Sequence, residues 1–232
     1  MNDSAALRDD VLRRMRLASH AAAHGHGNVR DIDLLAVSKT RSAAEIRALA
    51  MLGQRAFGEN YVQEAVAKQR DLADLQLEWH LIGHLQSNKA REAAEAFDWV
   101  QSVDRPRLVA ALAQHRVGER PPLNVLIQVN IDGEAGKSGC RPDEVFRLAD
   151  AIAAEPRLAL RGLMAIPQPD PDLQRRRVAF RALRHLHGTL QERHPQIDTL
   201  SMGMSEDFEL AIAEGATMVR IGTAIFGPRG RK

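Results

Sequence analysis

Residues 34–45 read LLAVSKTRSAAE, an apolar run that passes directly into polar residues and then into a helix-like segment. The apolar run predicts a short buried strand over residues 34–37. Ser42 followed by Glu45 is a capping-box pattern, which predicts the beginning of a helix. A strand followed at once by a helix is the repeating unit of parallel α/β folds, so the number of such units decides the architecture.

Seven more apolar runs follow along the chain at intervals suited to such units, with glycine or proline near the predicted helix ends. The eight predicted strands cover residues 34–37, 55–58, 78–83, 99–103, 123–130, 158–166, 199–202 and 218–222. Eight units predict a closed (β/α)8 barrel of the TIM type rather than an open doubly wound sheet. We expect one domain over residues 1–232, with an additional N-terminal helix within residues 1–27 and the barrel over residues 33–229.

The composition fits a globular domain, because 44% of the residues are hydrophobic and 27% are charged. The 32 basic and 30 acidic residues are interspersed, so the charge indicates no nucleic-acid partner, and the arginine-rich stretch over residues 175–184 is expected to be a solvated helix face. The first 27 residues carry charges throughout, which predicts neither a signal peptide nor a membrane span. Cys140 is the only cysteine, so we expect no intrachain disulfide, no metal site and a cytoplasmic location.

Polar residues gather where the predicted strands end, which is where TIM barrels place their working groups. Lys39 directly follows a buried strand, so its amine is expected at the barrel mouth, where partial loss of hydration would lower its pKa and make it a nucleophile. A solvated lysine at a strand end is the alternative. Gly222 and Thr223 open a helical turn whose backbone N–H groups suit a phosphate, and Ser201 adds a hydroxyl. Together these residues predict a phosphorylated carbonyl ligand, which leaves a Schiff-base aldolase open.

Several longer strings resemble one known family, the YggS/PROSC family of pyridoxal 5′-phosphate (PLP) homeostasis proteins. They are LLAVSKT, FGENYVQE, WHLIGHLQSNK, NVLIQVNIDGEAGKSG, LRGLMAIP and LSMGMSEDFELAIAEGATMVRIGTAIFG, spread in order from residue 34 to residue 227. The resemblance implies a barrel related to the N-terminal domain of bacterial alanine racemase, with PLP as the cofactor. One departure is His84, where related sequences often have proline, and it affects only the local loop.

Site residues follow from the resemblance position by position. They are Lys39 as the Schiff-base anchor of PLP, Arg220 opposite the pyridine nitrogen, Asn60 near the ring, and Ser201, Gly222 and Thr223 at the phosphate. Because a guanidinium does not readily give up its proton, Arg220 should keep the pyridine nitrogen unprotonated and weaken the ring as an electron sink. Carbanion chemistry is thereby discouraged.

The resemblance therefore implies a non-catalytic PLP carrier that buffers the cofactor and supplies apo-enzymes, and we expect a monomer. An amino-acid racemase or another PLP enzyme acting on small amino acids is the alternative, and it requires acid/base groups on both faces of the substrate carbon. Alanine racemase brings a tyrosine from a second domain, which we do not expect in a chain that ends at Lys232. Tyr61 is expected to begin a helix and pack, His80 to be a hydrogen-bonded core residue, and His84 to be the remaining acid/base candidate.

Overall fold

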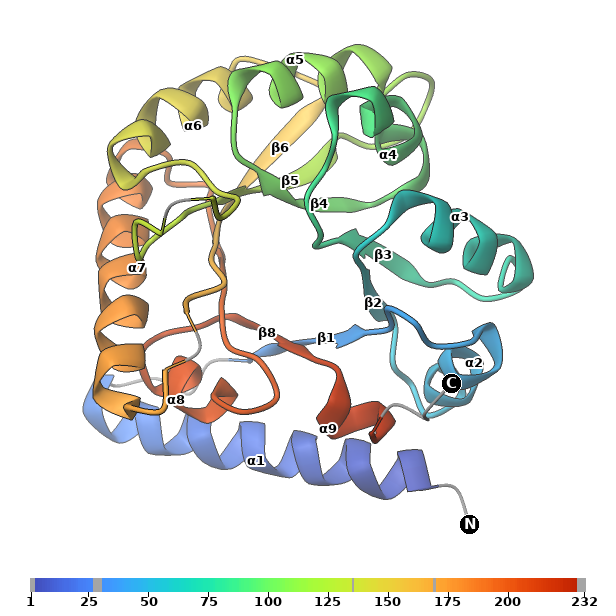
Figure 1. Cartoon of the computed structure of the whole chain (residues 1–232), viewed down its shortest axis with the longest axis vertical. Helices are drawn as coiled ribbons and strands as arrows, with labels where there is room; N and C mark the ends of the chain where they lie inside the picture. The colour runs from blue at the N-terminus through green and yellow to red at the C-terminus, as the bar shows by residue number, and fades with distance from the viewer. Residues whose placement is uncertain (1–2, 27–30, 135, 169, 229–232) are drawn as a thin grey trace.

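The eight predicted strands form a closed, parallel barrel in sequence order in the computed structural model, which describes residues 3–26, 31–134, 136–168 and 170–228 (Figure 1). The predicted fold is confirmed. The strands are β1 (Asp33–Val37), β2 (Ala56–Glu59), β3 (Glu78–Leu81), β4 (Trp99–Val103), β5 (Leu123–Gln128), β6 (Leu158–Met164), β7 (Thr199–Ser201) and β8 (Met218–Ile221). Pairing of β1 with β8 closes the barrel, and it sets Leu35 beside Arg220.

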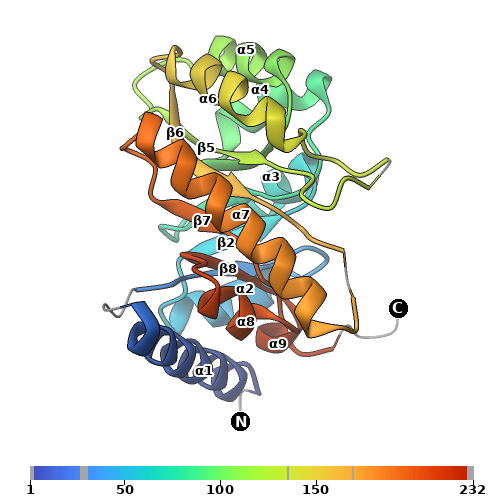
Figure 2. The ribbon, with the colours of Figure 1, turned by 90° about the vertical axis from the view of Figure 1, so that its left-hand side faces the viewer.

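Helices cover the outside of the barrel. The α-helices are α1 (Asp3–His26), α2 (Ala43–Met51), α3 (Val62–Asp71), α4 (Ala90–Ala96), α5 (Pro106–His115), α6 (Val145–Ala153), α7 (Leu173–Arg193), α8 (Phe208–Ala213) and α9 (Thr223–Phe226), and the short 3-10 turns are η1 (Ser87–Lys89) and η2 (Pro142–Glu144). The additional helix α1 lies across α8 and α9 on one side of the barrel (Figures 1 and 2). Arg14 ties it there, because this side chain pairs with Glu209 and stacks over the ring of Phe208.

The local signals in the sequence explain where the helices begin and end. The Ser42 N–H donates to a Glu45 carboxylate oxygen at 2.7 Å, and the Glu45 N–H donates back to the Ser42 hydroxyl at 3.3 Å, so the predicted capping box is confirmed. Gly53 and Gly215 end α2 and α8 in left-handed conformations, with φ of +91° and +100°. Helix α1 ends at His26, so it lies within residues 1–27 as predicted.

Three strands are shorter than predicted by two residues at their C-terminal ends. Strands β3, β5 and β6 end at Leu81, Gln128 and Met164, although the apolar runs continue beyond them. An apolar residue need not belong to a paired strand, and the extra residues belong to loops at the barrel mouth. Ile166, for example, is 41% exposed there.

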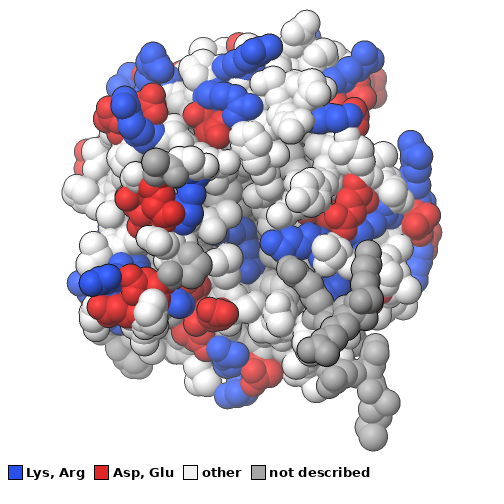
Figure 3. Space-filling model, viewed as in Figure 1, with Lys and Arg blue, Asp and Glu red and all other residues white. Residues whose placement is uncertain are grey.

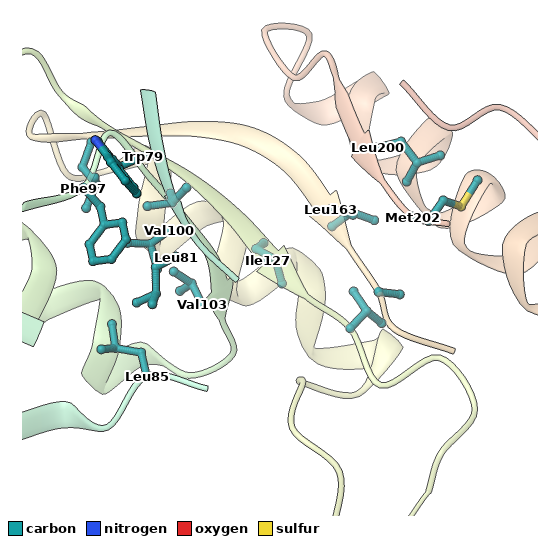
Figure 4. Close-up of a cluster of buried hydrophobic side chains, with 14 of the residues drawn as sticks. Trp79, Leu81, Leu85, Phe97, Val100, Val103, Ile127, Leu163, Leu200 and Met202 are labelled. Carbon is teal, nitrogen blue, oxygen red and sulfur yellow. The ribbon is translucent and has the colours of Figure 1, made fainter. Parts of the chain in front are cut away.

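Two apolar layers hold the barrel together. A large cluster lies between the strands and the helices, and Figure 4 shows part of it around Leu81, Val100 and Ile127. Two smaller clusters lie inside the barrel: Leu35, Val37, Ile82 and Met218 form one of them, and Trp99, Leu126 and Met164 form the other. Among the described residues, no helix is long and apolar enough to cross a membrane.

Gly162 in β6 offers a test of the packing between β6 and β7. Its φ is +143°, and a Cβ atom there would collide with the carbonyl oxygen of Thr199. Gly162→Ala is expected to lower the free energy of unfolding by about 2 kcal/mol or more, because strain and overpacking add. The matched control Gly188→Ala, on an open face of α7, should raise it by about 0.5–1 kcal/mol. Urea unfolding of both variants measures the difference, and equal effects of the two substitutions would contradict the packing argument.

Candidate functional site

A cavity of about 590 Å³ opens at the C-terminal mouth of the barrel. Figure 3 shows a hollow at the centre of this face, with Lys and Arg side chains in and beside it. Five of the six predicted site residues line the cavity, and they are Lys39, Asn60, Arg220, Gly222 and Thr223. They come from the loops or ends of β1, β2 and β8, so closure of the barrel brings together residues that lie far apart in the sequence.

Lys39 is partly exposed, and its backbone is fixed on both sides. Ser38 before it is fully buried, and its backbone N–H donates to the carbonyl oxygen of Gly58 at 2.9 Å. Thr40 after it has a φ of +64°, the only positive value for a non-glycine residue in the described part of the chain. A threonine rarely adopts this left-handed conformation, so the surroundings must hold it there.

A buried ion cluster on α3 supplies that support. The Lys68 ammonium donates to the backbone oxygen of Ser38 at 2.8 Å and to carboxylate oxygens of Glu59 and Glu64, each at 2.7 Å. The same Glu64 oxygen accepts the Thr40 N–H at 2.6 Å. All three ammonium protons are thus used, and the residues on either side of Lys39 are both tied to α3. Burial raises the pKa of Glu59, against the hydrogen bonds from Lys68 and Ser38 that lower it.

Arg220 lies on the inner face of β8 and is 3% exposed. One terminal nitrogen donates to the Ser201 hydroxyl and the other to the backbone oxygen of Ala165, both at 2.8 Å. Burial lowers the pKa of this guanidinium to about 10, so it is still charged at neutral pH. The cavity therefore contains a fixed positive charge that donates hydrogen bonds and accepts none.

Backbone donor groups gather at the end of the cavity where β8 passes into α9. The backbone N–H groups of Gly222 and Ala224 both point at the hydroxyl oxygen of Ser205, at 3.3 Å and 3.4 Å. Ser205 lines the cavity together with Gly222 and Thr223. These groups form a set of donors and a hydroxyl suited to a phosphate.

Ser201 differs from its predicted place at the phosphate. It is fully buried in β7, it does not line the cavity, and its hydroxyl is shared between Arg220 and Gln101. The physical reason is strand alternation, which turns this residue into the barrel interior beneath Arg220. Ser205, four residues later in the loop after β7, lies where the hydroxyl had been expected.

The remaining candidates divide between the cavity and the core. His84 lines the cavity and lies 3.1 Å from the Ser138 hydroxyl. His80 is a hydrogen-bonded core residue, as predicted, because Glu78 and Gln101 contact its two ring nitrogens. Tyr61 begins α3 as predicted, but its side chain is 66% exposed and does not pack.

The arginine-rich face of α7 is only partly solvated. Arg177 and Arg181 both pair with Glu214 at 2.9 Å, whereas Arg175 is exposed. Arg176 is 13% exposed, lies 3.6 Å from an Asp207 oxygen and lines the cavity. The sequence pattern did not distinguish it, since its neighbours on the helix are also arginines. Its place at the site depends on how α7 packs against the loop before α8.

Comparison with known proteins places the chain in a family. A profile described as "Alanine racemase, N-terminal domain" matches residues 18–230. The "Pyridoxal phosphate homeostasis protein" of Pseudomonas aeruginosa is 52% identical over 219 residues, which cover 94% of this chain and 93% of that protein. The chain belongs to the pyridoxal phosphate homeostasis protein family. The member from Escherichia coli K12 is 54% identical over 202 residues, or 86% of each chain.

Solved structures extend the comparison to the fold of the family. PipY of Synechococcus elongatus, solved without PLP, matches with a TM-score of 0.80 and 41% identity over 90% of this chain and 99% of that one. A PipY structure with PLP bound matches with a TM-score of 0.78 and 38% identity, at the same coverage. Alanine racemase from Corynebacterium glutamicum shares the fold at 19% identity and a TM-score of 0.66, with 96% of this chain and 62% of the racemase covered.

The buried cluster on α3 predicts a large effect of removing its cation. Lys68→Met is expected to lower the free energy of unfolding by about 3–5 kcal/mol, because Glu59 is left buried without its partner. Lys89→Met removes an exposed pair with Glu92 and should cost less than about 1 kcal/mol. Urea unfolding of the two variants provides the comparison. A loss of stability at position 68 no larger than at position 89 would show that the cluster does not support the Lys39 segment.

Proposed function

We propose that this protein binds PLP, holds it covalently through the amine of Lys39, and serves as a reservoir of the cofactor rather than as an enzyme. One observation carries the proposal: the lysine Lys39, the fixed cation of Arg220 and the backbone and hydroxyl groups around Gly222 lie on the wall of one cavity. PLP offers an aldehyde, an accepting pyridine nitrogen and a phosphate, so each group of the cofactor has a partner of suitable chemistry.

The cavity suits the cofactor in size as well as in chemistry. Its volume of about 590 Å³ is within the range of about 300–1,000 Å³ that is usual for sites of small ligands. Lys39 would hold the aldehyde carbon, Asn60 would lie beside the ring, and Arg220 would face the pyridine nitrogen. Gly222, Thr223 and Ser205 would hold the phosphate, with Ser205 in the role that the sequence had given to Ser201.

Arg220 supports a carrier rather than a catalyst. When bound, PLP supplies an electron sink, which is weaker when its ring nitrogen carries no proton. Arg220 is a permanent donor held from two sides, so it can give that nitrogen a hydrogen bond but not readily a proton. Tyr61, the only tyrosine, does not line the cavity, whereas His84 does, together with the ionisable side chains of Lys137, Glu206 and Asp207.

The proposal extends to the partners and the setting of the protein. The names of the relatives support a role in PLP homeostasis, in which apo-enzymes would be the recipients of the cofactor. We further propose a single domain that acts as a monomer in the cytoplasm, where its buried, unpaired Cys140 would remain reduced. Light scattering and a transfer assay with an apo-enzyme would test these points.

The central prediction concerns Lys39. Protein incubated with PLP is expected to show a visible absorption band that borohydride makes permanent, with the label on Lys39 in peptide mass spectra. Lys39→Ala should lose both the band and the label, because no amine remains at that position. Lys89→Ala, which changes a lysine outside the cavity, should keep both. A borohydride-stable label on a different lysine of the wild-type protein would refute the proposal.

A second prediction separates the carrier from an amino-acid racemase. Incubation of the PLP-loaded protein with small amino acids in deuterated solvent should give exchange of the α-hydrogen far slower than ordinary enzyme turnover. Turnover of about 1 per second or faster would favour the racemase. A Schiff-base aldolase, the third possibility, predicts a protein that remains without PLP and cleaves its substrate in the absence of the cofactor.

A further inference from the structure

A continuous line of polar side chains crosses the interior of the barrel beneath the cavity. Arg220 of β8 contacts Ser201 of β7 at 2.8 Å, and Ser201 contacts Gln101 of β4 at 2.8 Å. Gln101 contacts His80 of β3 at 2.9 Å, and His80 contacts Glu78 of the same strand at 2.7 Å. This interior relay, defined as Arg220, Ser201, Gln101, His80 and Glu78, links the cavity to a carboxylate near the opposite end of the barrel.

The hydrogen bonds of the relay all run in one direction. Arg220 can only donate, so the Ser201 oxygen accepts from it, and the Ser201 hydroxyl proton is left to donate to the Gln101 carbonyl oxygen. The Gln101 amide nitrogen then donates to Nδ1 of His80, which must be unprotonated there. Nε2–H of His80 donates to Glu78, whose pKa this hydrogen bond lowers, so the relay ends on an ionised carboxylate that can only accept.

This polar line occupies a place that barrels ordinarily fill with apolar side chains. Ser201, Gln101 and His80 are completely or almost completely excluded from solvent. The relay contacts both apolar clusters of the interior, because Gln101 lies 3.1 Å from the Met218 sulfur and His80 stacks on Trp99 with their ring planes 8° apart. Buried polar groups are costly unless every partner is present, so a fully paired line in this place fixes its members in one arrangement.

The interior relay has one member in the cavity, and that member is Arg220. Its guanidinium is held by two acceptors, the Ala165 backbone oxygen and the Ser201 hydroxyl. The backbone acceptor is fixed by the strand, whereas the hydroxyl can rotate about its C–O bond. Only Gln101 restrains that rotation, because its carbonyl oxygen takes the hydroxyl proton and leaves the oxygen lone pairs facing Arg220.

We propose that Ser201, Gln101 and His80 are positioning residues, which act through Arg220 to set the hydrogen bond that this arginine gives to the pyridine nitrogen of PLP. The inference rests on the proposed function and adds a role to it. Gln101 joins Arg220 and Ser201 to His80, since its carbonyl oxygen accepts from Ser201 and its amide nitrogen donates to His80. Ser201 thereby acts on the ring nitrogen and not on the phosphate.

The test uses the full chain loaded with PLP that carries ¹⁵N in its ring, with the ¹⁵N and ³¹P resonances and the rate of PLP dissociation as readouts. Ser201→Ala and Gln101→Leu are expected to move the ¹⁵N resonance and to speed PLP dissociation roughly tenfold, the factor for one hydrogen bond to a charged group. The ³¹P resonance should stay in place in both. Ser205→Ala, the same chemical change at the phosphate end, should instead move the ³¹P resonance.

Two further variants separate positioning from a loss of stability. Gln101→Glu keeps an acceptor for Ser201 and can accept from a protonated His80, so it is expected to retain the wild-type ¹⁵N resonance. Gln54→Leu removes a buried glutamine that donates only to backbone oxygens outside the relay, and it should lower the thermal midpoint without moving either resonance.

The outcomes are distinct from those of the proposed function. Wild-type protein that takes up no PLP would overturn both proposals together. Wild-type protein that takes up PLP on Lys39, while Ser201→Ala leaves the ¹⁵N resonance and the dissociation rate unchanged, would overturn the positioning role alone. Movement of the ³¹P resonance in Ser201→Ala would also overturn it, because it would place this serine at the phosphate.

Discussion

Pairing of β1 with β8 is the constraint on which the whole site depends. Leu35 lies beside Arg220 and Ala36 beside Ile221, so the first and last strands of the barrel run together with a fixed register. Lys39 and Gly222, which lie 183 positions apart in the sequence, therefore enter the same cavity. A shift of this register by one residue would turn Arg220 away from the interior, because side chains alternate between the two faces of a strand.

Contacts between the loops around the site hold the walls of the cavity in place. On the side of β1, the ion cluster of α3 fixes the backbone before and after Lys39, so this residue has little backbone freedom. The guanidinium of Arg41 reaches the backbone oxygen of Gly227 and stacks over Phe226, which ties the loop after β1 to α9. The segment that carries Lys39 and the turn that begins α9 are thus joined by direct contacts as well as by the sheet.

Much of this arrangement could be predicted from the sequence because its signals are local. A capping box, a glycine at a helix end and an apolar run each report on a few neighbouring residues, and these signals led to eight strands and a barrel. Family motifs and the tendency of functional groups to lie at strand ends led to six predicted site residues, and five of them line the cavity. The predicted C-terminal ends of β3 and β6 were less accurate, because Ile82 and Ile166 are apolar residues that line the cavity and lie beyond the strands.

What could not be predicted depends on the direction of side chains and on contacts across the barrel. Ser201 and Ser205 both follow apolar residues in the sequence. Only the alternation of side chains along β7 shows that Ser201 faces the barrel interior, whereas Ser205 lines the cavity. One signal in the sequence could have identified Gln101, because it is a polar residue in the middle of the buried strand WVQSV. Its partner Ser201 is 100 positions away, so the pair could be recognised only in the folded chain.

The polar interior and the open mouth of the barrel would affect a bound cofactor in different ways. In the proposed complex with PLP, the fixed guanidinium of Arg220 would favour an unprotonated ring nitrogen, which weakens the ring as an electron sink. At the mouth of the cavity, His84 and Ile166 are exposed, so water or an incoming amine can enter. A catalytic site gains from excluding water, whereas a reservoir must let its ligand leave. Rigid support below and access above therefore suit the proposed reservoir, which would have to keep PLP unreactive and still release it.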